Sequence, residues 1–297
     1  MTPNSVSPDR VAGQPLPHES AHLHVAGRAP YIDDLPELAG TLHAALGLSP
    51  VAHGRLKRID VAGLKALPGV VAVLTAADIP GLNDCGALVH DDPILASGEV
   101  HYLGQPLLVV LSTQRELARR AAARTKDFVQ IEPLPAILSP EEAHAAGQYV
   151  VPPMRLRRGD VDAAFAHAPE RLQGRFHLGG QEHFYLEGQI AYAIPREDRG
   201  LLVHSSTQHP SEMQHAIAHA LNLHAHHVQV ESRRMGGGFG GKESQSAVFA
   251  CVAALAAHTL QRPVKLRPDR DDDMMITGRR HCFAPDFDVA HDAARRI

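Results

Sequence analysis

Cysteine is scarce in this sequence of 297 residues, which contains only Cys85, Cys251 and Cys282. The three are far apart and form no C-x-x-C pair, so they cannot ligate an iron–sulfur cluster within this chain. Cys251 falls in an apolar segment and is best interpreted as a small core residue. Any electron transfer through iron–sulfur clusters would therefore need another polypeptide to carry them.

Long apolar runs are also lacking, and none would span a bilayer. The start, Met1 to Ser5, lacks the basic and apolar regions of a signal peptide. The formal net charge of −4 argues against nucleic acid or an anionic membrane as the main partner. With 44% hydrophobic and 21% charged residues, the composition is that of an ordinary soluble globular protein, and the length suggests about two domains. We expect a cytoplasmic protein.

The densest group of glycines lies between Gly236 and Gly241, which hold five of the chain's 24 glycines. It falls between a strand-like run at 227–231 and a helix-like run at 246–260. Glycine permits positive φ and a close approach of ligand to main chain, and the start of the next helix offers free N–H groups to an anion. We therefore expect a bulky, anionic ligand at this loop.

Two familiar patterns match the loop by spacing. Gly236-x-Gly238-x-x-Gly241 matches a dinucleotide fingerprint, but the acid expected about 20 residues later is absent, since Val252 to His258 contains no carboxylate. Gly236, Gly241 and Lys242 also match a phosphate-binding loop, but Glu243 stands where Ser or Thr should hold magnesium. A glycine-rich turn needed only for tight packing is the third alternative.

Three separated motifs occur in order along the chain: Gly179 to Glu187, Arg234 to Ser244, and Asp269 to Met274. Together they resemble signatures of the xanthine dehydrogenase and aldehyde oxidase family of molybdenum hydroxylases, with its molybdopterin-binding subunits as the nearest likeness. The resemblance extends back through Gly104 to Pro106 and Gly40 to His43, so it covers nearly the whole chain. Each motif alone is suggestive, and their common order is specific.

The resemblance implies an α+β fold in which residues 18–132 form a hammerhead-type domain. Before it, the polar residues 1–17 are predicted to be a disordered arm. Residues 133–153, which are interrupted by prolines, are predicted to be a linker. Residues 154–297 would be the first, incomplete part of a molybdopterin-binding domain. Because family members are longer, we expect the chain to be an amino-terminal portion that is truncated at Ile297.

The resemblance also implies an activity. Molybdenum held by molybdopterin would hydroxylate hypoxanthine to xanthine and xanthine to urate, with water as the oxygen source. Electrons would pass through two 2Fe–2S clusters and FAD, expected on a partner subunit of a hetero-oligomer, to NAD. The catalytic base would lie beyond Ile297, so no catalytic residue is assigned here and the chain alone is expected to be inactive. Alternatives are an aldehyde oxidase-type hydroxylase, a phosphate-loop nucleotide-binding module and a piece that serves only assembly.

Four residues take site roles by the same resemblance. Gln181 would donate its side-chain amide to the metal's oxygen ligand, and an amide offers this N–H without adding a charge. Phe239 and Gly240 would place main-chain groups against the molybdenum centre. Glu243 would hydrogen-bond the purine, whereas aldehyde oxidases tend to have an apolar residue there, so its presence favours a purine substrate.

Other polar residues are predicted to be structural. Glu182 and Glu187 are separated by an odd number of positions, which would place them on opposite faces of a strand, so they could not act as a pair. His183 is predicted to be a histidine of this strand whose hydrogen bonds are satisfied. The run Asp271 to Asp273 is predicted to serve helix capping and solvation rather than magnesium binding. A metal site in the run His224 to His227 is possible, but solvated side chains are the preferred interpretation.

The periodicity of the sequence predicts the main elements. Strands are expected at 41–48, 70–75, 106–111, 171–177, 186–194 and 201–205. Helices are expected at 61–67, 114–128, 211–222 and 246–260, with Ser211 as the N-cap of the third.

Overall fold

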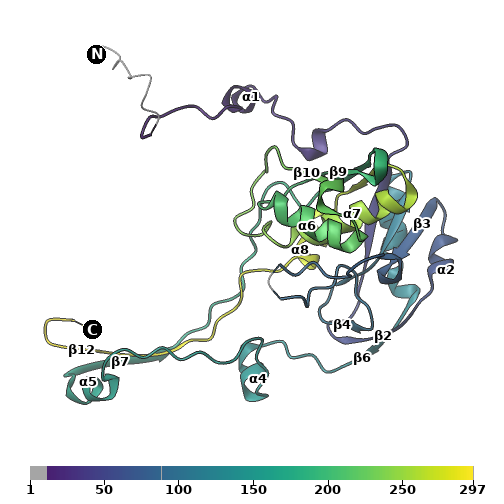
Figure 1. Cartoon of the computed structure of the whole chain (residues 1–297). Coiled ribbons are helices and arrows are strands. Elements are labelled where there is room, and N and C mark those ends of the chain that lie inside the picture. The colour runs from purple at the N-terminus through teal and green to yellow at the C-terminus, as the bar shows by residue number, and fades with distance from the viewer. Residues whose placement is uncertain (1–11, 88, 297) are drawn as a thin grey trace, which may run out of the picture.

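The computed structural model describes residues 12–87 and 89–296 (Figure 1). Residues 1–11 of the predicted disordered arm lie outside them. The α+β class is confirmed. The helices are α1 (Ala21–Val25), α2 (Val61–Lys65), α3 (Arg115–Ala122), α4 (Pro140–Ala145), α5 (Val161–His167), α6 (Pro210–Leu221), α7 (Ser246–Leu260) and α8 (Arg270–Ile276). The strands are β1 (Leu42–Leu48), β2 (Gly54–Ile59), β3 (Val70–Thr75), β4 (Glu99–Val100), β5 (Pro106–Ser112), β6 (Val129–Pro133), β7 (Glu170–Arg175), β8 (Ala191–Pro195), β9 (Leu201–Ser205), β10 (Val228–Glu231), β11 (Val264–Leu266) and β12 (Asp286–His291).

One sheet joins the two parts of the chain. Its strand order is β10-β9-β8-β11-β1-β5-β3, so four strands from after the predicted linker and three strands from before it lie as two adjacent blocks in a single hydrogen-bonded layer. The seam is a parallel pairing of β1 with β11, in which Leu42 lies opposite Val264. Arg119 of α3 also forms an ion pair with Asp269, next to α8. The linker predicted at 133–153 stays a prediction. In the fold, the segments before and after it contribute strands to one sheet.

Strand β5 lies inside this sheet and is buried along its whole length, as its continuous apolar sequence predicts. Successive side chains of a strand point to opposite faces. Accordingly Val109 and Leu111 join the core cluster under α6 and α7, whereas Leu108 and Val110 join the cluster that contains Ala121 of α3. Helix α7 is almost entirely apolar, and all its residues from 246 to 257 except the partly buried Val248 are buried, because α6 covers the face that it turns away from the sheet.

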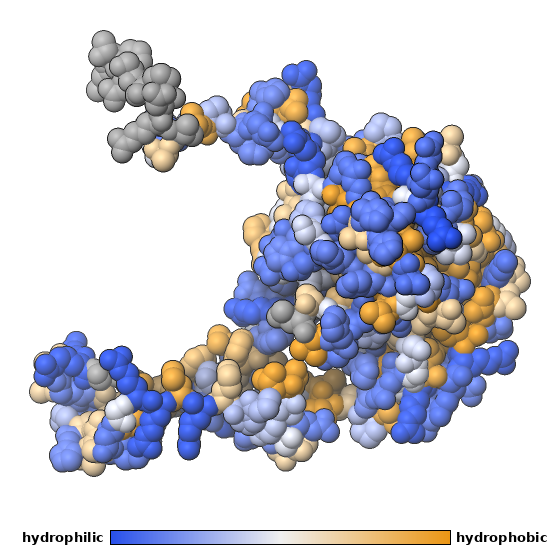
Figure 2. Space-filling view, viewed as in Figure 1, coloured by the Kyte–Doolittle hydropathy of each residue, from blue (hydrophilic) through white to orange (hydrophobic). Residues whose placement is uncertain are grey.

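A ribbon of two strands extends away from the sheet (Figure 1). Strands β7 and β12 pair antiparallel, and Arg175 forms an ion pair with Asp286 across them at 2.6 Å. Apolar residues are exposed along this arm, as the orange surface in Figure 2 shows. Leu172 and Phe176, for example, are 60% and 48% exposed.

Three predicted elements are placed differently. The helix expected at 114–128 ends at Ala122, and a short 3-10 helix follows at Thr125–Asp127. The strand expected from residue 186 begins at Ala191, and the residues before it turn toward the glycine-rich loop. Helix α6 begins at Pro210 and His209 is its N-cap, so the predicted cap Ser211 is wrong; proline suits the first helical position because its missing N–H would have no partner there.

No helix in the described part of the chain is both long and apolar enough to cross a membrane.

Candidate functional site

The glycine-rich loop lies between β10 and α7, as predicted, and faces a cavity of about 620 Å³. Gln181, Phe239 and Gly240 all line this cavity, so the structure brings together the three residues predicted to contact the cofactor. Their roles toward a cofactor stay predictions. The remaining lining residues come from the Gly179 to Glu187 motif, from the position just after the glycine-rich motif and from the segment before β12: Glu182, His183, Gln245, Arg279, Arg280, His281 and Phe283.

Close packing explains several of the glycines. A Cβ at Gly236 would lie 2.5 Å from Cβ of Glu187, and one at Gly238 would lie 2.5 Å from Oε1 of Gln208. A Cβ at Gly241 would lie 2.8 Å from the His183 ring. Real Cβ atoms do not approach so closely, so these positions need glycine because the loop is pressed against the 183–187 segment and Gln208.

Phe239 is the exception within the loop. Its φ of 53° is left-handed, a conformation that costs a non-glycine residue about 1–2 kcal/mol. Its side chain is 75% exposed and therefore recovers little of this cost by burial. A strained, exposed aromatic residue beside a cavity indicates a functional constraint.

Lys242 points into the protein, away from the cavity. Its side chain is fully buried, and Nζ donates to the Glu187 carbonyl at 2.6 Å, the Gly188 carbonyl at 3.2 Å and the Ser206 hydroxyl at 2.7 Å. Burial lowers the pKa of this ammonium, although the nearby Glu187 carboxylate opposes the shift. Because all its donor directions are used inside the fold, Lys242 cannot serve as the phosphate-reaching lysine of a nucleotide loop.

Glu187 completes this buried connection. One carboxylate oxygen accepts from the Ser206 hydroxyl at 2.7 Å and from the Gly236 N–H at 2.9 Å, and it lies 3.5 Å from Nζ of Lys242. The side chain is only 12% exposed. Glu187 thus has the structural role predicted for it, but it acts by holding the first residue of the glycine-rich loop rather than as part of a strand.

A second polar network lies beside the first. The Asp273 carboxylate, 1% exposed, accepts from the Tyr185 hydroxyl at 2.7 Å and from the Gln189 N–H at 2.6 Å. The Gln189 amide in turn donates to the Gly241 carbonyl at 3.0 Å. Burial, and secondarily the bond to Asp273, raises the pKa of Tyr185. The prediction of a capping or solvated role is wrong for Asp273; the cap of α8 is Asp269, which accepts from the Asp272 N–H.

Gln208 is a supporting residue that the sequence reasoning missed. Its Oε1 accepts from the N–H groups of Gly240 at 3.0 Å and Lys242 at 3.3 Å, while its Nε2 lies 3.5 Å from Oε1 of Glu243. No spacing rule singles it out. The only signal is its position just after the end of β9, where a polar side chain can reach a neighbouring loop.

Glu243 is exposed and lies next to Gly240, where a Cβ would come within 3.9 Å of Oε1 of Glu243. It is not among the residues that line the cavity, so the structure places it beside the predicted cofactor position. Gln181 pairs with Arg280 through main-chain bonds of 3.1 and 3.0 Å. Its side chain is exposed and makes no hydrogen bond to another described residue.

These residues fit a large anionic cofactor. The cavity offers a free amide at Gln181, the residues Phe239 and Gly240, and two guanidinium groups at Arg279 and Arg280. The Gly240 N–H is held by Gln208. Guanidinium groups suit phosphate oxygens. His183 does not lie in a strand as predicted; its ring lines the cavity and stacks on Tyr185 with a centroid separation of 6.4 Å.

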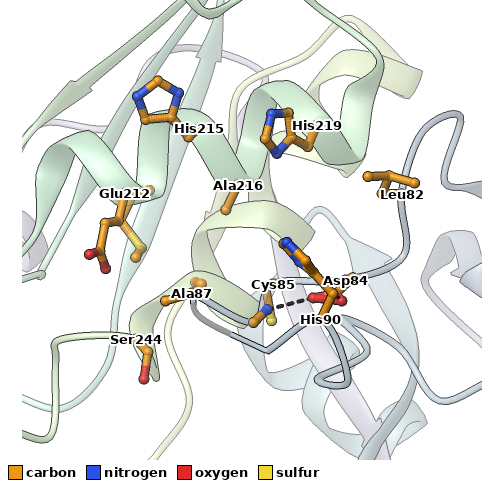
Figure 3. Close-up of a pocket in the computed structure, with 13 residues that line it drawn as sticks. Leu82, Asp84, Cys85, Ala87, His90, Glu212, His215, Ala216, His219 and Ser244 are labelled. Atoms are coloured by element: carbon orange, nitrogen blue, oxygen red, sulfur yellow. Dashed lines mark hydrogen bonds and ion pairs between the residues drawn. The ribbon is translucent and has the colours of Figure 1, made fainter.

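A second, smaller cavity of about 230 Å³ lies between α6 and a loop that contributes Asp84 to Ala87 and His90 (Figure 3). His215 and His219 of α6 and Ser244 at the end of the glycine-rich segment are among the residues that line it. Cys85 lies at its floor, where burial raises the pKa of the thiol, so this cysteine is not a reactive thiolate.

Comparisons with known proteins agree with the geometry. Residues 143–297 match the family model of a molybdopterin cofactor-binding domain, and residues 26–132 match the aldehyde oxidase and xanthine dehydrogenase a/b hammerhead domain. A xanthine dehydrogenase of Oryza sativa subsp. japonica is 43% identical over 93% of this chain and 20% of the relative. A xanthine dehydrogenase/oxidase of Felis catus is 36% identical over 99% of this chain and 22% of the relative. The chain therefore spans about a fifth of the length of these curated relatives.

Among solved structures, an aldehyde oxidoreductase from Desulfovibrio gigas superposes with a TM-score of 0.80 and 28% identity. The match covers 93% of this chain and 32% of that one.

The buried ammonium predicts a measurable loss of stability. Lys242→Met should lower the free energy of unfolding by about 3 kcal/mol, because the Glu187 carboxylate and two carbonyls would lose their donor in a buried site. Urea unfolding measures this, with the exposed Lys65→Met as the matched control, expected within about 0.5 kcal/mol of wild type. Adding Glu187→Gln should recover part of the loss. A Lys242→Met chain as stable as the control would contradict the account.

Proposed function

Because the chain belongs to the xanthine dehydrogenase and aldehyde oxidase family, we propose that it supplies one wall of the molybdopterin site of a purine-hydroxylating enzyme. The observation that carries the proposal is the shared cavity of Gln181, Phe239 and Gly240. When bound, the molybdenum–molybdopterin group would supply transfer of an oxygen from water to a ring carbon and accept the two electrons. Hypoxanthine and xanthine are the proposed substrates, and xanthine and urate the products.

The chain's own residues would bind and orient the cofactor. Gln181 lines the cavity and would donate a neutral N–H there, which can stabilise a metal oxygen without changing the net charge. Gln208 accepts from the Gly240 N–H and so fixes the main chain at that residue, and a fixed dipole stabilises charge without reorganising during the reaction. The exposed ring of Phe239 would cover the cofactor and keep water away from it.

Glu243 would set the substrate. Its exposed carboxylate beside Gly240 can accept an N–H of a purine, and the Gln208 amide, 3.5 Å away, steadies it. The resemblance implies that aldehyde-oxidising members tend to have an apolar residue here, so the carboxylate favours a purine. The likeness to the aldehyde oxidoreductase of Desulfovibrio gigas supports the second candidate, an aldehyde or heteroaromatic substrate.

Electrons would leave through groups outside this chain. Cys85 and Cys251 are buried and Cys282 is partly exposed, and no described cysteine belongs to a cluster of metal-ligating side chains. The 2Fe–2S clusters and FAD would lie on a partner subunit, with NAD as acceptor; the length of the relatives also allows them to lie on a longer form of the same polypeptide. Three free thiols fit the proposed cytoplasmic location, where thiols stay reduced.

The role of Glu243 can be tested in the complete enzyme. A hydrogen bond to a charged group contributes about 1.5–3 kcal/mol, so Glu243→Ala should lower kcat/KM for xanthine by about 10- to 150-fold. The exposed Glu197→Ala serves as the control, and molybdenum content shows whether the site stays loaded. An unchanged kcat/KM for xanthine would refute the purine assignment, and loss of aldehyde oxidation instead would favour the second candidate.

The isolated chain is proposed to be inactive, because a catalytic base and most cofactor contacts are expected outside it. Expressed with the cofactor machinery, the 297-residue chain should hold little molybdenum, whereas a form extended to the length of the relatives should hold molybdenum and pterin and reduce NAD with xanthine. Xanthine turnover by the isolated chain would overturn the expectation. If neither form held molybdenum, the cofactor role itself would be wrong.

A further inference from the structure

His53, Glu99 and His101 converge on the small sheet β4-β2-β6, and none of them lines the glycine-loop cavity. Over the described residues, they form the one group of three possible metal ligands whose ligand atoms all lie within 4.8 Å of one another. The sequence reasoning considered a metal at His224 to His227 instead. Those rings stack closely, with His226 and His227 centroids 4.2 Å apart, but no such ligand group forms there.

Strand pairing explains the convergence. In the antiparallel pair of β2 and β4, Gly54 lies opposite Val100 and Arg55 opposite Glu99. The flanking residues His53 and His101 therefore come opposite each other, and their rings stack at 6.4 Å. Glu99 is two residues from His101 and so lies on the same face. The register alone places two imidazoles and one carboxylate together.

The orientation of His53 is fixed in the way that metal ligands require. Its Nδ1 lies 2.6 Å from the Pro135 carbonyl, and because a carbonyl can only accept, Nδ1 carries the hydrogen. The second nitrogen, Nε2, then faces Oε1 of Glu99 at 2.8 Å. A histidine that donates its other N–H to a backbone carbonyl is the usual arrangement around a bound metal, since it fixes the tautomer and the ring.

We propose that His53, Glu99 and His101 bind one divalent ion of the zinc class. Two imidazole nitrogens with one carboxylate oxygen suit zinc, whereas calcium and magnesium prefer oxygen ligands alone. Three protein ligands leave the fourth tetrahedral position to water. The His53 and Glu99 side chains are 30% and 46% exposed, so an ion reaches them directly from solvent.

The ion would stabilise the small sheet β4-β2-β6, which is a weak part of the fold. Strand β4 has two residues, and β2 and β6 are largely exposed. The metal would join the start of β2 to β4 and the residue after it. Through the bond from His53 to the Pro135 carbonyl, it would also hold the segment that follows β6. This role is structural and separate from the molybdopterin site.

Zinc titration of the full 297-residue chain tests the proposal. After removal of metals with EDTA, calorimetry in a non-chelating buffer should show one zinc ion per chain, and zinc should raise the Tm. His101→Gln removes one ligand and should weaken this binding by at least about tenfold and abolish the Tm shift. His226→Gln, in the other dense histidine group, is the matched control and should bind as wild type. Cobalt should give visible absorption bands that His101→Gln loses.

The result that would overturn the proposal is the absence of zinc binding, or equal binding by wild type and His101→Gln. Binding of nickel or copper without zinc would refute the assignment to zinc. His101 is exposed and its side chain makes no hydrogen bond to another described residue, so the variant should fold. Circular dichroism of the metal-free form checks this, and Glu99→Gln, expected to lose the same site, gives an independent second variant.

Discussion

The buried ammonium of Lys242 is the contact on which the glycine-rich loop depends. It bonds to the Glu187 and Gly188 carbonyls and to the Ser206 hydroxyl, so it connects the end of the loop, the segment before β8 and the end of β9. Because these partners lie behind the loop, the loop turns Phe239 and Gly240 toward the cavity. Burying the Lys242 ammonium costs desolvation free energy, but it fixes this wall of the cavity before any ligand binds.

The shared sheet gives this wall its rigidity. Strands β8 and β9 adjoin the segments that hold Lys242. Strand β8 pairs with β11, and β11 pairs with β1 from the part of the chain that resembles a hammerhead domain. Asp273 of α8 then ties Tyr185 and the Gln189 N–H together across the same region. The two halves of the chain therefore position one site together, although the sequence suggests two domains in series.

The features of the structure that depend on local sequence pattern and on the order of the motifs could be predicted from the sequence. The buried strand β5, the apolar helix α7 and the loop between β10 and α7 follow from periodicity, and the α+β class and the family follow from three motifs in order. Gln208, the inward turn of Lys242 and the burial of Asp273 were not predicted, because each depends on partners far away in the sequence. The late start of β8 has the same origin: Glu187 and Gln189 bond to the loop and α8 rather than to a neighbouring strand.

Hydrogen exchange of the metal-free chain tests the central claim most directly. The N–H groups of Gly236, Gly240, Gly241 and Lys242 are all bonded within the protein, so they should exchange much more slowly than those of the exposed segment 149–159 without any cofactor present. Lys242→Met should remove this protection while leaving β5 protected. If the loop amides of the wild-type chain exchanged as fast as the exposed segment, the loop would not be preorganised and the account would be wrong.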